Sequence, residues 1–112
     1  MIIPAKYDLI IRNGEDFSFV FDIDVDGVTL DLSAATVESQ IRETRDRAGT
    51  IIDAFTVAIS VANEVTLSLN DTETLAITKS GGYYDVAVTI GTTTNYYLEG
   101  KVTFTNSITV PA

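Results

Sequence analysis

The segment FDIDVDGVTLDLS has the residue types of a calcium-binding loop. Asp22, Asp24 and Asp26, followed by a glycine, match the start of an EF-hand loop, where carboxylate oxygens bind the ion. The last position of that loop needs a bidentate Glu, and here it is Ser33, which has a single hydroxyl oxygen. We therefore predict no calcium site. We expect Asp22 and Asp24 on the exposed face of a strand, and Asp26-Gly27 at a hairpin tip.

Catalytic residue types are scarce in this chain. It contains neither His nor Cys, so the common general bases, thiolate nucleophiles and zinc ligands are missing. Lys79 and Ser80 are the residue types of a Ser–Lys dyad, but neighbours in sequence seldom face each other. Carboxylate pairs arise by chance among 16 acidic residues. We predict a non-enzyme with no catalytic, cofactor-binding or metal-binding residues.

Two pairs of adjacent tyrosines remain as candidate binding residues. On a strand, neighbouring side chains point to opposite faces, so one tyrosine of each pair must face outward. Outward tyrosines form either a contact patch or ordinary cross-strand packing. They also supply the aromatic planes on which sugars stack. The candidates for such a platform are Tyr83, Tyr96 and Tyr97.

Length and charge restrict the possible partners. The 112 residues predict a single domain, 1–112, and the 46% hydrophobic content is typical of a folded protein. A net charge of −9 repels nucleic acid. The basic cluster of Arg42, Arg45 and Arg47 is either a solvated turn or a patch for an acidic partner protein.

The beginning of the chain does not have the features of a signal peptide. MIIPAKYDLIIR has no basic leading region, and Pro4 interrupts its apolar run. No apolar stretch approaches the roughly 20 residues of a membrane-spanning helix. These features predict synthesis in the cytoplasm and no membrane contact.

The elements that must carry these residues are predicted by period-two alternation of apolar and polar side chains. It indicates strands at 7–12, 16–25, 28–30, 36–43, 51–60, 64–69, 83–90, 96–105 and 108–110. The side chains predicted to face inward are Phe17, Phe19, Phe21, Ile23, Val25, Val37, Ile41, Phe55, Val57, Ile59, Val65, Leu67, Leu69, Tyr84, Val86, Val88 and Ile90.

Between these strands, residues 70–82 interrupt the alternation. Asp71 or Thr72 would cap one short helical turn, with Leu75 as its apolar contact. Seven to nine short strands with turns between them predict an all-β fold, an antiparallel sandwich or barrel. The sandwich is favoured because long and short strands mix and residues 70–82 resemble a corner connection between two sheets. Tyr84 stands where immunoglobulin-like folds place a tyrosine corner, so the expected form is an antiparallel immunoglobulin-like β-sandwich.

Four stretches in this order resemble small immunoglobulin-like structural proteins of tailed bacteriophages: DLSAATVESQIRE, VTLSLNDTETLAI, GGYYDVAV and YYLEGKVTFTNSIT. The layout is also similar to the N-terminal domain of phage baseplate upper proteins, which attaches receptor-binding proteins to the tail. In that family a Tyr-Asp strand is followed by a Leu-x-Gly-x-Val strand, as Leu98, Gly100 and Val102 stand here.

The resemblance implies a virion protein without catalytic residues. Its partners would be other virion proteins of the tail, baseplate, fibre or capsid, with a homo-oligomer on the particle as a further possibility. A tail, baseplate or fibre adaptor is the leading function; the alternatives are a capsid decoration (cement) protein and a carbohydrate-binding module that uses the surface tyrosines.

The first residues, 1–5, are a candidate N-terminal arm. Met1, Ile2 and Ile3 precede Pro4, which cannot donate to a strand ladder, so the regular strand should begin after it. The three apolar side chains either fold onto the domain's own core or reach a neighbouring subunit.

Overall fold

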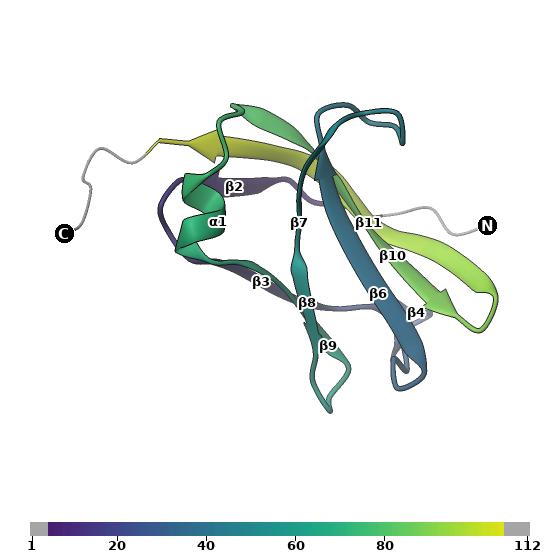
Figure 1. Ribbon diagram of the computed structural model, residues 1–112. Coiled ribbons are helices and arrows are strands. Elements are labelled where there is room, and N and C mark those ends of the chain that lie inside the picture. The colour runs from purple at the N-terminus through teal and green to yellow at the C-terminus, as the bar shows by residue number, and fades with distance from the viewer. Residues whose placement is uncertain (1–4, 107–112) are drawn as a thin grey trace.

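The computed structural model describes residues 5–106, which form an all-β structure with eleven strands and one short helix (Figure 1). The elements are β1 (Ala5–Lys6), β2 (Leu9–Arg12), β3 (Phe17–Asp22), β4 (Asp24–Val25), β5 (Val28–Thr29), β6 (Ala35–Arg42), β7 (Ile51–Ala54), β8 (Thr56–Ile59), β9 (Glu64–Leu69), α1 (Asp71–Leu75), β10 (Gly81–Ile90) and β11 (Thr93–Thr105). The number of strands exceeds the predicted seven to nine because the predicted strands at 16–25 and 51–60 are each broken into two, and because β1 precedes the first predicted strand.

The strands form two larger sheets and one separate hairpin. Sheet A has the order β1-β11-β10-β6-β7, with β2 also on β11; sheet B has the order β3-β9-β8; β4 pairs only with β5. The pairing is antiparallel except for β1 and β2, which run parallel to β11. Buried side chains of both sheets form one apolar cluster, so the arrangement is sandwich-like.

Alternation predicted the buried faces of the central strands correctly. The inward side chains that are buried as predicted are Ile23, Val37, Ile41, Phe55, Val65, Leu67, Leu69, Tyr84, Val86 and Val88. The prediction was wrong for Val25, Ile59 and Ile90, which are 39%, 38% and 40% exposed. These three lie at the ends of strands next to hairpin turns, where no facing sheet covers them.

The predicted strand at 51–60 is divided between the two sheets. β7 pairs with β6 in sheet A, and β8 pairs with β9 in sheet B. Phe55 lies between them, almost completely buried, and its backbone N–H donates to the carbonyl of Ser39 at 3.0 Å. A strand that switches sheets in this way forms a corner of the sandwich.

Helix α1 begins one residue earlier than predicted. Its N-cap is Asn70, not Asp71 or Thr72. The Asn70 side chain accepts from the N–H of Glu73 at 2.8 Å, and the Glu73 carboxylate accepts from the N–H of Asn70 at 2.9 Å. This reciprocal capping box satisfies N–H groups that the helix itself leaves free.

The apolar contact expected from Leu75 was also wrong. Leu75 is 63% exposed, whereas Thr74 and Ile77 are buried. The Thr74 hydroxyl donates to the carbonyl of Glu15 at 2.9 Å and accepts from the N–H of Gly14 at 3.0 Å. The helix is therefore attached to the β2–β3 turn by hydrogen bonds rather than by a leucine.

Tyr84 of β10 is bound to the segment between β1 and β2, two strands of the same sheet. Its hydroxyl donates to the carbonyl of Tyr7 at 2.6 Å, a bond that spans 77 residues. A tyrosine corner bonds only a few residues upstream, so that prediction was wrong. Burial and the nearby Asp8 carboxylate raise the pKa of Tyr84, which keeps the hydroxyl protonated as a donor. Gly100 permits this approach, because a Cβ there would collide with the Tyr7 carbonyl.

Some predictions fall outside residues 5–106. The strand at 108–110 and the arm residues 1–4 belong to these; Ala5, the last residue of the predicted arm, begins β1. Within 5–106, the structure contains no helix long and apolar enough to cross a membrane.

Replacing Tyr84 with Phe should destabilise the protein. The change removes the hydroxyl that bonds the Tyr7 carbonyl while keeping the ring, so the free energy of unfolding should fall by about 1–2 kcal/mol. Urea unfolding would measure this loss. The matched control is Tyr83→Phe on the outer face, which should change stability much less; equal stability of the two variants would contradict the role of the bond.

Candidate functional site

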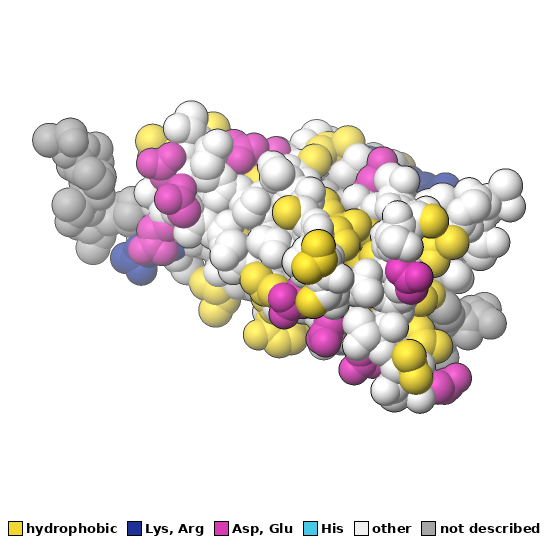
Figure 2. All heavy atoms as spheres, turned by 90° about the horizontal axis from the view of Figure 1, so that it is seen from below, with side chains coloured by type: hydrophobic (Ala, Val, Ile, Leu, Met, Phe, Trp, Pro, Cys, Tyr) yellow, Lys and Arg dark blue, Asp and Glu magenta, His cyan; other side chains and the backbone are white. Residues whose placement is uncertain are grey.

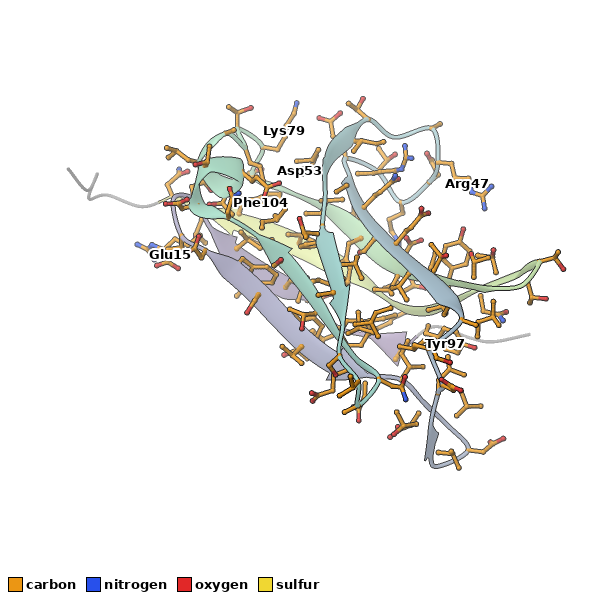
Figure 3. All side chains as sticks on the ribbon, turned by 60° about the horizontal axis from the view of Figure 1, so that its bottom comes forward. Glu15, Arg47, Asp53, Lys79, Tyr97 and Phe104 are labelled. Carbon is orange, nitrogen blue, oxygen red and sulfur yellow. The ribbon has the colours of Figure 1, made fainter. Side chains whose placement is uncertain are left out.

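The outer face of sheet A carries a hollow of about 500 Å³. Outward side chains of β6, β10 and β11 form its floor, and Gln40, Asp85 and Glu99 lie in one cross-strand row. The loop of residues 43–50, between β6 and β7, forms one wall, and Figure 3 shows Arg47 on this loop. The hollow thus combines strand side chains, fixed by the sheet, with loop side chains that lean over it.

Arg42, the last residue of β6, holds this loop in place. Its Nη1 donates to the carbonyl oxygens of Arg47 at 3.1 Å and Gly49 at 2.8 Å. At the loop tip, one carboxylate oxygen of Asp46 accepts from the N–H of Ala48 at 2.9 Å. A charged donor that bonds to loop carbonyls stabilises the loop conformation, because those carbonyls would otherwise bond only to water.

The other two arginines of the predicted basic cluster reach the sheet. Arg45 Nη2 lies 2.7 Å from Glu99 Oε2, and its guanidinium lies 5.7 Å from the centre of the Tyr83 ring. Arg47 Nη2 donates to the Tyr96 hydroxyl at 3.1 Å. Exposed contacts of this kind contribute little to stability, but they fix the loop over the hollow. Of the predicted cluster, Arg45 and Arg47 lie in the loop and Arg42 ends β6, and all three guanidinium groups form hydrogen bonds within the chain.

Asp85 supplies a free acceptor at the floor. Its backbone carbonyl accepts from the Ser39 hydroxyl at 2.7 Å, which fixes its position, while its carboxylate makes no hydrogen bond with the residues of 5–106. Partial burial and the neighbouring Glu99 raise the pKa of Asp85, although Arg42 and Arg47 oppose them.

Two of the three candidate tyrosines lie together in this hollow. Tyr83 and Tyr96 both line it, from β10 and β11. Tyr97 does not, because β11 carries a bulge there: Leu98 pairs with Val86 and Tyr96 with the next residue of β10. Tyr97, labelled in Figure 3, instead packs against the core.

The side chains of the hollow offer several kinds of contact to a bound molecule. Carboxylate and amide groups accept or donate hydrogen bonds, and the phenol rings of Tyr83 and Tyr96 offer flat apolar surface, although the Arg45 guanidinium already lies over the Tyr83 ring. Lys79, which the sequence analysis considered and rejected as part of a Ser–Lys dyad, lies outside the hollow and forms an ion pair of 2.7 Å with Glu43. The hydrogen bond from Lys79 lowers the pKa of Glu43.

The positions predicted for the opening segment are confirmed. Asp22 and Asp24 are exposed, and Asp26 and Gly27 have φ angles of 54° and 81° at the tip between β4 and β5. Positive φ at both turn residues is the geometry of a tight two-residue hairpin. Among residues 5–106 no group of three or more His, Cys, Asp or Glu side chains is placed to hold a metal ion.

A second surface lies at the tips of two hairpins, β4–β5 and β8–β9, which we call the hairpin end. The N–H of Leu32 donates to the Asn63 side chain at 3.0 Å, which ties the segment after β5 to the β8–β9 turn. Its exposed apolar side chains are Val25, Val28, Ile59 and Val61. Figure 2 shows hydrophobic and acidic side chains close together on the underside of the molecule.

Sequence reasoning did not single out Asp85 or Glu99. Alternation in the predicted strand 83–90 already placed Asp85 on the same face as Tyr83, and this signal could have found it. The pairing of Asp85 with Glu99 depends on the register of a hairpin with a bulge, which the sequence does not reveal. No protein-family model and no curated protein matches the chain.

Replacing Asp85 with Asn should stabilise the protein slightly at neutral pH. A raised folded-state pKa means that the ionised carboxylate destabilises the fold, and that this penalty appears as the pH rises. Because Asp85 is only partly shielded from water, the gain at pH 7 should be only a few tenths of a kcal/mol, and it should vanish below pH ~4. Thermal unfolding across pH would measure it.

The control for this experiment is Glu15→Gln, an exposed change away from the hollow. A loss of stability in Asp85→Asn at pH 7 would show that the ionised carboxylate makes favourable contacts instead.

Proposed function

We propose that the protein is a non-catalytic structural protein of a bacteriophage virion that connects tail, baseplate or fibre components through protein–protein contacts. The proposal includes an immunoglobulin-like form of the β-sandwich. It is supported by the four stretches that resemble phage structural proteins, by two sheets around a shared core, and by a sequence without His or Cys.

The observation that carries the proposal is the hairpin end. Val28 and Val61 are 69% and 105% exposed, on two neighbouring hairpins. Apolar side chains gathered on hairpin tips contribute nothing to the core and are typical of contact surfaces. Next to them, β3 and β8 are the edge strands of sheet B, with backbone groups that another chain could pair.

Mass spectrometry of purified phage particles would test the proposal. We expect the protein in the particles, at a copy number well below that of the major capsid protein. A copy number close to that of the capsid protein would instead support capsid decoration. Absence from the particles, together with abundance in the cytosol of infected cells, would contradict a virion function altogether.

A second function, carbohydrate binding, is favoured by the hollow on sheet A. Tyr83 and Tyr96 line it together with the amide of Gln40, whose oxygen accepts from Arg42 Nη2 at 2.9 Å, and the carboxylate of Asp85. Sugar recognition combines stacking on aromatic rings with hydrogen bonds to the sugar hydroxyl groups, and the hollow contains residue types for both. Arg45 is already paired with Glu99, so the hollow suits a neutral sugar better than an acidic one.

Binding to an array of neutral glycans would test this second function. We expect Tyr83→Ala and Tyr96→Ala each to weaken binding about tenfold, because each removes one stacking surface of roughly 1–2 kcal/mol. Leu75→Ala, an exposed apolar change outside the hollow, is the matched control. Absence of binding by the unmodified protein would rule the function out.

A further inference from the structure

The hairpin end is acidic as well as apolar. The sequence contains no Lys or Arg between positions 13 and 41 or between 48 and 78, and both hairpins fall within these ranges. The exposed carboxylates on or beside the two hairpins are Asp22, Asp24, Asp26, Asp31 and Glu64. The four exposed apolar side chains are therefore bordered by negative charge, with no basic residue from either hairpin to neutralise it.

One pair of these carboxylates is placed unfavourably for the isolated protein. Asp22 and Glu64 lie directly opposite each other in the β3–β9 ladder, and both are exposed. Like charges in directly opposite positions destabilise a sheet. Among residues 5–106 the ion pairs are Arg45–Glu99 and Lys79–Glu43, so neither Asp22 nor Glu64 is neutralised by one.

We propose that the hairpin end docks onto a basic surface of another protein, with an apolar centre that receives Val28 and Val61. This inference rests on the proposed function, because it names the chemistry of the adaptor's partner. Lys and Arg side chains around that centre would face the five carboxylates and relieve the repulsion between Asp22 and Glu64.

The negative charge of the hairpin end favours a basic protein over other binding partners. A second copy of the chain, placed tip to tip, would bring two sets of carboxylates together, and the net charge of −9 adds to the repulsion. Nucleic acids and anionic membranes carry the same sign of charge. A basic protein surface offers opposite charge at the rim and apolar contact at the centre.

The first experiment identifies what touches the hairpin end. A photo-crosslinking amino acid would replace Val28 in one version of the full chain and Leu75 in another. Both versions would be produced in cells that make the protein. Crosslinking would then be carried out in those cells and in the particles that they release. Crosslinked products would be identified by mass spectrometry. We expect the Val28 position to capture one protein specifically, and the equally exposed Leu75 position not to capture it.

The second experiment measures binding of that purified protein. Val28→Asp and Val61→Asp should each weaken binding at least tenfold, whereas Leu75→Asp, a matched exposed change, should not. The double variant Asp24→Asn/Glu64→Gln should weaken binding and reduce its dependence on salt, because it removes charges that face the basic rim. Glu15→Gln is the matched control, and melting temperatures would confirm that each variant is folded.

The results separate this inference from the proposed function. A basic partner captured at Val28 that is not a virion protein would support the inference and contradict the virion function. A virion protein captured only at Leu75 would contradict the inference and support the virion function. Capture of a second copy, of lipid, or of nothing at Val28 would overturn the inference. So would tighter binding after neutralisation of Asp24 and Glu64.

Discussion

The whole structure depends on one segment that belongs to both sheets. Residues 51–59 pair first with sheet A and then with sheet B, and Phe55 is buried where the change occurs. Its ring lies 6.0 Å from the ring of Phe17 and 6.2 Å from that of Tyr84, so it contacts aromatic side chains of both sheets. Its N–H is satisfied by Ser39. The corner thus helps to bring the apolar faces of the two sheets together, where each covers the other from water.

Ser39 links this buried corner to the hollow on the outer face of sheet A. The carbonyl of Ser39 accepts from Phe55, while the Ser39 hydroxyl donates to the backbone of Asp85 at 2.7 Å. Ser39 is buried, so both bonds are protected from water. The floor of the hollow is therefore held by the sheet corner, whereas its wall is held by the bonds of Arg42 to the loop carbonyls and by the exposed contacts of Arg45 and Arg47.

Alternation could predict the face of a residue, but not what covers that face. It succeeded within β6, β9 and β10, where a facing sheet exists, and failed for Val25, where none does. It also could not show that the strand changes sheets at Phe55, since inward positions look alike in either sheet. The cap at Asn70 was missed because three successive residues are all good caps. The hollow could not be predicted because it includes the contact between Arg45 and Glu99, which are 54 residues apart in the sequence. No local sequence pattern indicates such a contact.

The β4–β5 hairpin is the element that contributes least to the stability of the fold. It pairs only with itself, and its base is held by the buried side chain of Ile23 and the 2.7 Å bond from the Leu30 N–H to the Ile23 carbonyl. Beyond that base, the tip from Val25 to Val28 buries no side chain, yet ordering each residue costs about 1–2 kcal/mol of backbone entropy. The turn at Asp26-Gly27 reduces this cost by favouring the hairpin locally. A tip that is ordered by its own turn but contributes nothing to the core has its apolar and acidic side chains free for contact with another molecule.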